Sequence, residues 1–281
     1  MSESFLTPPE MGAYAQEAAL KKARTKNGKL FVLAMLGGLY VGFGGMFATL
    51  IATGSLGILP FGIAKSLMGI AFSLGLISVV VGGAELFTGS TVLSLAVVDK
   101  KIGWSRLFSN LSIVYAGNFV GSLILAAMVL VSKHYQVGSG AVGKMMLTIA
   151  TSKLHYGFSQ VLVLGILCNL FVCLAIWLTY GSKQITGKIL AIIFPITAFV
   201  ALGFEHCVAN MYMIPVAWMI KFFDPAFVAS ANMDVSTLTI SHFLLANLLP
   251  ATIGNVIGGS VIWLSYLHVY REQPKLVEQE A

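Results

Sequence analysis

The sequence predicts an all-α membrane protein with six transmembrane helices, arranged as two inverted halves of three helices each. Hydrophobic residues make up 57% of the 281 residues and charged residues only 10%, whereas an average soluble domain has roughly 25% charged residues. A spanning helix needs about 20 mostly apolar residues. Two of the long apolar runs also hold a glutamate, which is rare at membrane depth and usually marks a functional position. Six runs are long enough to span, at residues 30–51, 61–98, 107–131, 158–180, 189–220 and 243–270.

The first 29 residues precede these runs and contain no apolar segment of the signal-peptide type. Residues 7–10 (TPPE) resemble a capping box with proline in the first turn, which predicts an amphipathic helix from there to about Lys26. Its basic residues could rest on an anionic membrane surface. Two interpretations remain open for this helix, a solvated leader and a gating element.

The second and fifth runs are too long for one straight crossing, and each contains a glutamate flanked by glycine. Glu85 and Glu205 therefore predict that each run consists of two helical pieces joined by an irregular turn. Such backbone is tolerated at membrane depth only where it is buried in protein or lines a wet cavity. Each carboxylate could accept hydrogen bonds from amides freed by the break, which we favour, or could contact a permeating solute directly.

The third and sixth runs carry similar motifs, GNFVG at 117–121 and GNVIG at 254–258. The second and fifth runs share the glutamate at a predicted break. Three crossings per half is an odd number, so the second half must insert upside down relative to the first. This pattern predicts an inverted repeat, with the functional site where the broken helices meet at the midplane.

Lysine and arginine are distributed unequally between the two sides that six crossings would create. Twelve of the 17 fall on the side of the amino terminus, and the other five are Lys65, Lys133, Lys144, Lys153 and Lys221. The positive-inside rule then places both termini in the cytoplasm. The predicted organisation is a cytoplasmic amphipathic helix in 1–29, a channel domain in 30–270 and a cytoplasmic tail in 271–281.

His206 is the strongest candidate for chemistry, because it follows Glu205 directly and is the only histidine deep within an apolar run. A neutral buried imidazole can donate a hydrogen bond to an anion, and a protonated one can transfer a proton to it. A packing histidine without function is the alternative. The hydroxyl of Thr88 could face the ring, and the amide of Asn169 is a plausible partner for it. Four apolar side chains could form constrictions, although such residues more often serve packing: Phe72, Leu76, Leu86 and Phe199.

The sequence contains no signature of an enzyme. It has no phosphate-binding loop and no nucleophile elbow, and its three cysteines have neither metal-ligand nor disulfide spacing. The net charge of +6 arises from short basic patches between apolar runs, which indicate membrane topology rather than nucleic-acid binding. We expect no cofactor and no metal.

Residues 80–89 (VVGGAELFTG), 165–175 (GILCNLFVCLA), 204–206 (FEH) and 209–211 (ANM) resemble signatures of the formate/nitrite transporter family. The resemblance extends over essentially the whole chain. It implies an aquaporin-like fold, a homopentamer with one pore per protomer, and a place in the bacterial cytoplasmic membrane. It also implies passage of a small monovalent anion such as formate, nitrite or hydrosulfide.

The same resemblance implies roles for individual residues. His206 matches the central pore histidine, Thr88 the threonine opposite it, and Asn169 the amide that holds the histidine. Lys153 matches a basic residue at the outer mouth, and Phe87 belongs to the mobile loop that interrupts the second span. The apolar constrictions are matched by Phe72, Leu76, Leu86 and Phe199, and the helix breaks are stabilised by Glu85, Glu205 and Asn210.

Formate is the leading substrate hypothesis, because residues 203–206 (GFEH) followed by Asn210 look most like formate channels. Glu85 and Gly89 look more like nitrite or hydrosulfide channels, so these anions remain alternatives. An aquaporin-like pore for neutral solutes and a membrane protein without flux are further alternatives. The expected mechanism is that formate crosses as neutral formic acid after protonation through His206, since a bare anion is costly in a dry apolar ring.

Overall fold

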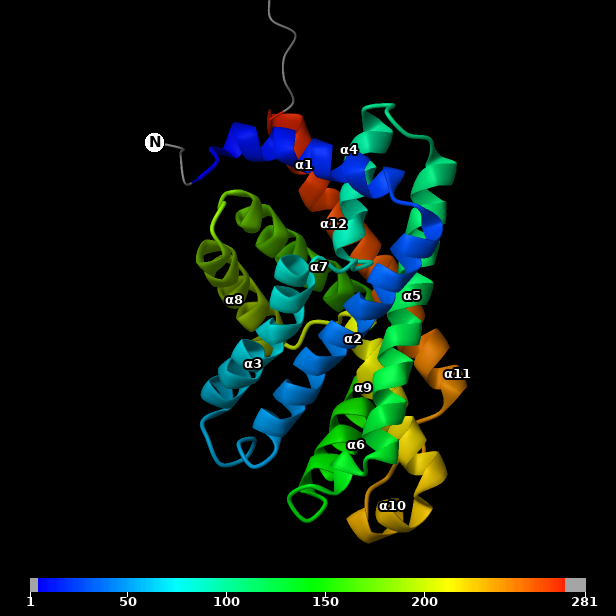
Figure 1. The fold of residues 1–281 in the computed structure, drawn as a ribbon. Helices are drawn as coiled ribbons and strands as arrows, with labels where there is room; N and C mark the ends of the chain where they lie inside the picture. Colours follow the sequence, from blue (N-terminus) through cyan, green and yellow to red (C-terminus); the bar gives the residue numbers. More distant parts are fainter. Residues whose placement is uncertain (1–4, 271–281) are drawn as a thin grey trace, which may run out of the picture.

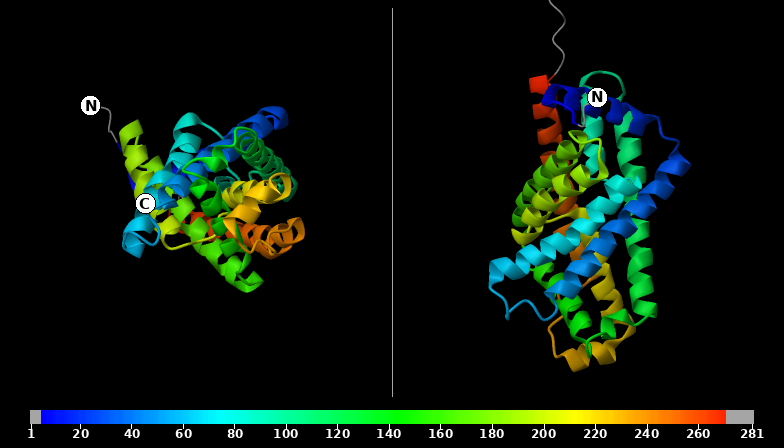
Figure 2. Two further views of the ribbon diagram at one scale, coloured as in Figure 1. Left: turned by 90° about the horizontal axis from the view of Figure 1, so that it is seen from below. Right: turned by 60° about the vertical axis from the view of Figure 1, so that its left-hand side comes forward.

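The computed structural model describes residues 5–270 as an all-helical protein. The predicted cytoplasmic tail at 271–281 lies outside the described residues. Long helices run along the molecule, while α1 lies across one end and α10 lies at the opposite end (Figures 1 and 2). The only extended pairing among residues 5–270 is an isolated bridge between Phe5 and Ser182.

The helices fall into two series along the chain, of which the first ends with α5 and the second with α12. The first series is α1 (Pro8–Arg24), α2 (Asn27–Ala52), α3 (Phe61–Gly82), η1 (Gly89–Val92), α4 (Leu93–Val98) and α5 (Trp104–Val131). The second series is η2 (His134–Gln136), α6 (Ala141–Leu154), α7 (Phe158–Tyr180), α8 (Ile185–Ala201), α9 (Cys207–Phe223), α10 (Pro225–Ala231), α11 (Ile240–His242), η3 (Phe243–Leu248) and α12 (Leu249–Tyr270).

Five helical segments in residues 5–270 are long and apolar enough to cross a membrane: α2, α3, α5, α7 and the segment Ile240–Tyr270. A sixth follows if α9 and α10, which are bent by 103° at Asp224, are counted together. Helix α8 has 17 residues and is a shorter apolar helix. The structure is thus a bundle of several apolar helices, as the composition predicted.

The helical backbone is interrupted near Glu85 and again near Glu205. Helix α3 ends at Gly82, and no regular helix resumes until Gly89. Helix α8 ends at Ala201 and α9 begins at Cys207. The turns pass through Gly83 and Gly203, whose φ angles of 76° and 75° lie in the left-handed region that glycine adopts without strain.

Glycine also sets the distance between the paired helices α2–α5 and α7–α12. A Cβ atom on Gly121 would lie 1.9 Å from the carbonyl oxygen of Met35, and one on Gly258 would lie 2.2 Å from that of Ile166. No larger residue fits without moving the helices apart. The GNFVG and GNVIG motifs therefore include the contact points of the two helix pairs, as small residues do in membrane bundles.

Helix α6 was not predicted from the sequence. Its 14 residues are too few to span a membrane, and Lys144 and Lys153 lower its hydropathy, so it gave no signal in a search for spans. Helix α6 nevertheless packs against α9 and contributes to the functional site described below.

Candidate functional site

The first interruption is held by the side chain of Asn118 from α5. Its amide nitrogen donates to the carbonyl oxygens of Glu85, at 2.9 Å, and Ala34, at 2.7 Å. Its amide oxygen accepts the backbone N–H of Phe87 at 2.9 Å. One buried asparagine thus satisfies three backbone groups, two of which the end of α3 leaves without helical partners.

Asn255 from α12 holds the second interruption in the same manner. Its amide nitrogen donates to Glu205 O at 2.9 Å and Gly165 O at 2.7 Å, and its amide oxygen accepts the N–H of Cys207 at 2.9 Å. The sequence analysis found both asparagines within repeated motifs but used the motifs only to predict an inverted repeat. The repeated Gly-Asn pair opposite each glutamate was the signal that could have revealed this role.

Glu205 is buried, with 1% of its surface exposed. Its carboxylate accepts hydrogen bonds from Lys153 Nζ at 2.8 Å, Asn210 Nδ2 at 2.6 Å and Asn247 Nδ2 at 3.0 Å. A fully buried carboxylate is stable only when it is paired and hydrogen-bonded in this way.

Glu85 also forms an ion pair with a lysine, but its carboxylate has fewer hydrogen-bond partners than that of Glu205. It forms an ion pair with Lys22 of α1, and Ser90 Oγ lies 3.4 Å from the same carboxylate. No backbone amide within residues 5–270 donates to either carboxylate, so the expected role of Glu85 and Glu205 as acceptors for freed amides was wrong. Asn118 and Asn255 perform that role, whereas the carboxylates bind lysines.

His206 lies at the amino-terminal end of α9 and is buried, with 3% exposed. Its Nδ1 accepts the N–H of Ala209 at 3.1 Å, and its Nε2 lies 3.1 Å from Thr88 Oγ1. Because Nδ1 serves as an acceptor, the neutral ring carries its proton on Nε2, where it donates to Thr88. The structure brings together the histidine and threonine that the sequence paired.

Asn169 does not bind His206, contrary to expectation. Its amide nitrogen donates to Thr88 O at 3.2 Å and to Asn255 O at 2.6 Å. The error arose because a buried amide needs a partner but does not specify which one. Asn169 instead fixes the backbone of the threonine that faces the histidine.

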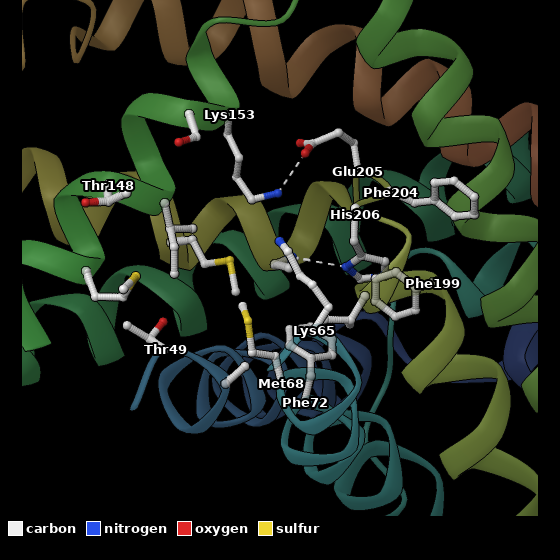
Figure 3. A pocket seen from close by; sticks show the side chains of 18 of the residues that line it. Thr49, Lys65, Met68, Phe72, Thr148, Lys153, Phe199, Phe204, Glu205 and His206 are labelled. Atoms are coloured by element: carbon white, nitrogen blue, oxygen red, sulfur yellow. Dashed lines mark hydrogen bonds and ion pairs between the residues drawn. The ribbon is translucent and has the colours of Figure 1, made fainter. Parts of the chain in front are cut away.

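A cavity of about 190 Å³, here called the Lys153 cavity, opens between α3, α6 and α9 (Figure 3). Polar and charged side chains on its wall include Lys65, Lys153, Glu205 and His206. The rings of Phe72 and Phe199 also line it and meet edge to face, with centroids 5.5 Å apart. Phe199 lies 6.1 Å from the His206 ring by the same measure.

A second cavity of about 470 Å³, here called the Lys22 cavity, lies under α1 at the other interruption. Its wall includes Lys22, Glu85, Leu86 and Val79. Leu76 lines neither cavity and is buried on α3 between Phe72 and Val79, on the same face of that helix. Of the predicted apolar residues, Phe72 and Phe199 thus line the Lys153 cavity, Leu86 lines the Lys22 cavity and Leu76 lines neither.

Phe87 lines neither cavity. It is 5% exposed and packs edge to face on Tyr115, with ring centroids 4.9 Å apart. Its predicted place along a substrate pathway has no support from these contacts.

The two cavities are built from corresponding residues. Residues 79, 80, 83–86 and 89 line the Lys22 cavity, and residues 199, 200, 203–206 and 209, each 120 positions later, line the Lys153 cavity. Residues 14, 18, 21, 22 and 25 correspond in the same way to 145, 149, 152, 153 and 156, each 131 positions later. Helix α1 therefore corresponds to α6, and Leu86 occupies the position that corresponds to His206.

No group of three or more histidine, cysteine, aspartate or glutamate side chains in residues 5–270 is arranged to hold a metal ion. The three cysteines are buried and free. The polar groups of the site instead line two cavities, and the buried His206 belongs to the wall of the Lys153 cavity.

A bundle of apolar helices with a polar cavity at each of two helix interruptions, and a buried His206–Thr88 pair, defines a multi-pass membrane protein of the channel or transporter class. The chain belongs to the formate/nitrite transporter family, whose sequence profile matches residues 9–269.

Relatives with assigned names are similar over nearly the whole chain. The formate channel FocA of Escherichia coli K12 is 40% identical and covers 94% of this chain and 95% of its own. That of Haemophilus influenzae is 39% identical and covers 93% of each chain. A solved structure described as a pentameric formate channel with formate bound is 39% identical, with a TM-score of 0.82, and covers 88% of this chain and 98% of its own.

Proposed function

We propose that the chain is a membrane channel for formate, and that the anion passes between the Lys153 cavity and the Lys22 cavity by way of His206. The observation that carries the proposal is the buried His206–Thr88 pair. It joins a residue on the wall of the Lys153 cavity to a threonine that follows Leu86 and precedes Gly89, two residues on the wall of the Lys22 cavity. The names of the formate channels that share 39–40% of its residues support the choice of formate.

The proposed architecture has six spans in an inverted repeat, with the second and fifth spans broken. In this arrangement α3 continues after its interruption through η1 and α4, and α8 continues through α9. The equal spacing of the cavity residues and the matching bonds of Asn118 and Asn255 support a repeat. Helix α8 alone is short for a crossing, which favours counting it together with α9.

The proposed location is the cytoplasmic membrane of a bacterium, with both termini in the cytoplasm. The distribution of lysine and arginine supports this orientation. The Lys22 cavity would then face the cytoplasm and the Lys153 cavity the outside. Residues 1–29 would form the cytoplasmic amino-terminal segment, 30–270 the channel domain and 271–281 the cytoplasmic tail.

The proposed assembly is a homopentamer in which each protomer has its own pore. The relative described as a pentameric formate channel supports this assembly. Both cavities and the residues between them are supplied by one chain, so a pore within each protomer needs no residue from a neighbour.

The proposed mechanism removes the charge of formate where the cost of carrying it is greatest. A carboxylic acid with a pKa of about 3.5–4 is only about one part in a thousand neutral at pH 7. A bare anion loses several kcal/mol or more of solvation in a dry apolar passage, whereas the neutral acid loses little. Formate is therefore protonated as it passes from a cavity that contains lysine to the apolar layer at Phe72, Leu76 and Phe199.

His206 is the group placed to exchange that proton. In its neutral form the ring donates its Nε2–H to Thr88 Oγ1. To protonate formate, the ring must first take a second proton from solvent onto Nδ1; the imidazolium then transfers one proton to the carboxylate and returns to the neutral ring. Protonation of Nδ1 would break the bond from Ala209 N–H, so the positively charged ring is costly at rest. An anion beside the ring offsets this cost, which would confine proton exchange to the moment of passage.

The test is formate flux into proteoliposomes at several pH values, with the wild type and a His206→Asn variant. We expect His206→Asn to lose both most of the flux and its pH dependence. Unchanged formate flux with unchanged pH dependence would defeat the mechanism. Nitrite and hydrosulfide in parallel test the other anions, and glycerol tests a pore for neutral solutes.

A further inference from the structure

Lys153, which the family resemblance places at the outer mouth, is already neutralised in the structure by Glu205. Lys153 Nζ lies 2.8 Å from Glu205 Oε1, and 1% of the Glu205 side chain is exposed. An anion that approached Lys153 would have to compete with a fully buried carboxylate in direct contact with it. Lys153 therefore contributes little net charge to its cavity.

Lys65 lines the same cavity and carries a charge that is not neutralised. Its side chain extends from α3 into the space that Lys153 enters from α6 (Figure 3). Among residues 5–270, no carboxylate lies within ion-pair distance of Lys65, and its charged nitrogen has only the ring of Phe61, 5.6 Å from the centroid. The cavity wall thus holds two lysines and one glutamate, and Lys65 accounts for the remaining positive charge.

The two halves of the chain show that the fold itself does not require a lysine at this position. The scaffold residues occur in both halves: Gly83 and Gly203, Glu85 and Glu205, Lys22 and Lys153, Asn118 and Asn255. At the spacing that relates α3 to α8, the counterpart of Lys65 is Ile185, which is exposed. An unpaired ammonium in a partly apolar cavity is unfavourable, so a role with a ligand is the better explanation.

We propose that Lys65 is the residue that attracts and holds the small monovalent anion in the Lys153 cavity, before the anion reaches His206. Lys153 and Glu205 then form a neutral structural pair beside it. This inference rests on the proposed function and names the residue that binds the substrate of that function at one mouth of the pore.

The test compares Lys65→Gln, Lys65→Arg and a matched control, Lys144→Gln, in formate uptake by proteoliposomes. Lys144 is an exposed lysine of α6 that does not line the cavity, so its replacement removes the same charge elsewhere. Loss of a single partly screened attraction predicts that Lys65→Gln raises the half-saturating formate concentration about five- to tenfold. The maximal flux should not fall, because formate crosses the apolar constriction as neutral formic acid, which the charge of Lys65 does not attract.

Two further outcomes separate binding from packing. Lys65→Arg should keep a half-saturating concentration near that of the wild type, because it retains the charge. Added inert salt should raise this concentration in the wild type more than in Lys65→Gln, because salt screens only a charge that is present.

The inference is overturned if Lys65→Gln leaves the half-saturating concentration unchanged, or if Lys144→Gln raises it equally. It is also overturned if Lys65→Arg behaves like Lys65→Gln, which would indicate packing. If the wild-type protein moves no formate in the same vesicles, the proposed function fails instead, and the two failures are thereby distinguished.

Discussion

Both nitrogens of the His206 ring are engaged by hydrogen bonds, and this sets the chemistry available to it. Nδ1 accepts from the backbone of α9 and Nε2 faces Thr88, so the neutral ring is oriented before any anion arrives. Such preorganisation lowers the cost of binding a charged group in a site from which water is excluded. Thr88 is itself fixed by Asn169, which donates to its carbonyl oxygen at 3.2 Å.

At the residue scale we predict that Thr88→Val impairs both the orientation of the His206 ring and the stability of the protein. Valine has nearly the shape of threonine but leaves the Nε2–H of His206 without its partner, which costs about 1–3 kcal/mol in a buried site. Thermal unfolding in detergent should show the loss, and formate flux should fall below that of Thr88→Ser, which keeps the hydroxyl. Wild-type flux in Thr88→Val would mean that the threonine hydroxyl plays no part.

At the scale of elements, the interruptions of the helices lie beside the two glutamates that the sequence analysis singled out. Two glutamates beside glycines indicated the turns at Gly83 and Gly203, because such residues are out of place in an unbroken apolar helix. The partners of the glutamates were not predictable, since Lys22 and Lys153 lie on helices that no hydropathy pattern ties to the breaks. Helix α6 was missed for the related reason that it is too short to span.

We predict that Asn118→Ala and Asn255→Ala destabilise the protein by similar amounts. Each removes three hydrogen bonds of matching length and leaves buried backbone groups unpaired, at a cost of about 1–3 kcal/mol per group. Melting temperatures in detergent measure the effect. Ser122→Ala on α5 is the control, because Ser122 Oγ makes one longer bond, of 3.3 Å, to Gly38 O. Variants no less stable than Ser122→Ala would contradict the assigned role.

Helix α1 begins with a capping arrangement that includes the titratable carboxylate of Glu10. The carboxylate of Glu10 accepts the hydroxyl and the backbone N–H of Thr7, both at 2.7 Å. These bonds, the hydroxyl first, hold the pKa of Glu10 below its ordinary value. The stabilisation of the helix end by these hydrogen bonds is therefore fully present above the ordinary pKa of a carboxyl group, and it is lost as the pH falls through the lowered pKa of Glu10.

We accordingly expect the first turn of α1 to lose protection against amide hydrogen exchange on acidification, after correction for the intrinsic exchange rate. A Glu10→Gln variant should show weaker protection at neutral pH and less change with pH. Equal pH dependence in the two proteins would show that another group controls this end of the helix.

At the scale of the whole molecule, the two cavities are corresponding structures with unequal charge partners. Glu205 has three donors and is almost fully buried, whereas Glu85 has Lys22, a distant serine and a side chain that is 12% exposed. The number of apolar runs and the family resemblance made the bundle predictable. The difference in charge partners between the Lys22 cavity and the Lys153 cavity was not predictable, because it depends on which side chains reach each carboxylate.

We predict that Lys153→Met destabilises the protein more than Lys22→Met. Removal of one partner from a buried ion pair typically costs about 3–5 kcal/mol, because the remaining charge is left buried without compensation. Water can reach Glu85 more readily and should reduce the penalty there. Thermal unfolding of both variants measures the difference, and second substitutions, Glu205→Gln and Glu85→Gln, should recover part of each loss. An equal loss in the two single variants would contradict the asymmetry.

The glycine contacts between α2 and α5 and between α7 and α12 also limit how this protein can move. With the Met35 carbonyl oxygen in the space where Gly121 would carry a side chain, the backbones of the paired helices pack directly against each other, and moving them apart would lose this close packing. We therefore expect each helix pair to move as one rigid unit. A conformational change that opens or closes the protein would then involve the turns at Gly83 and Gly203, or the short helices that pack against these pairs.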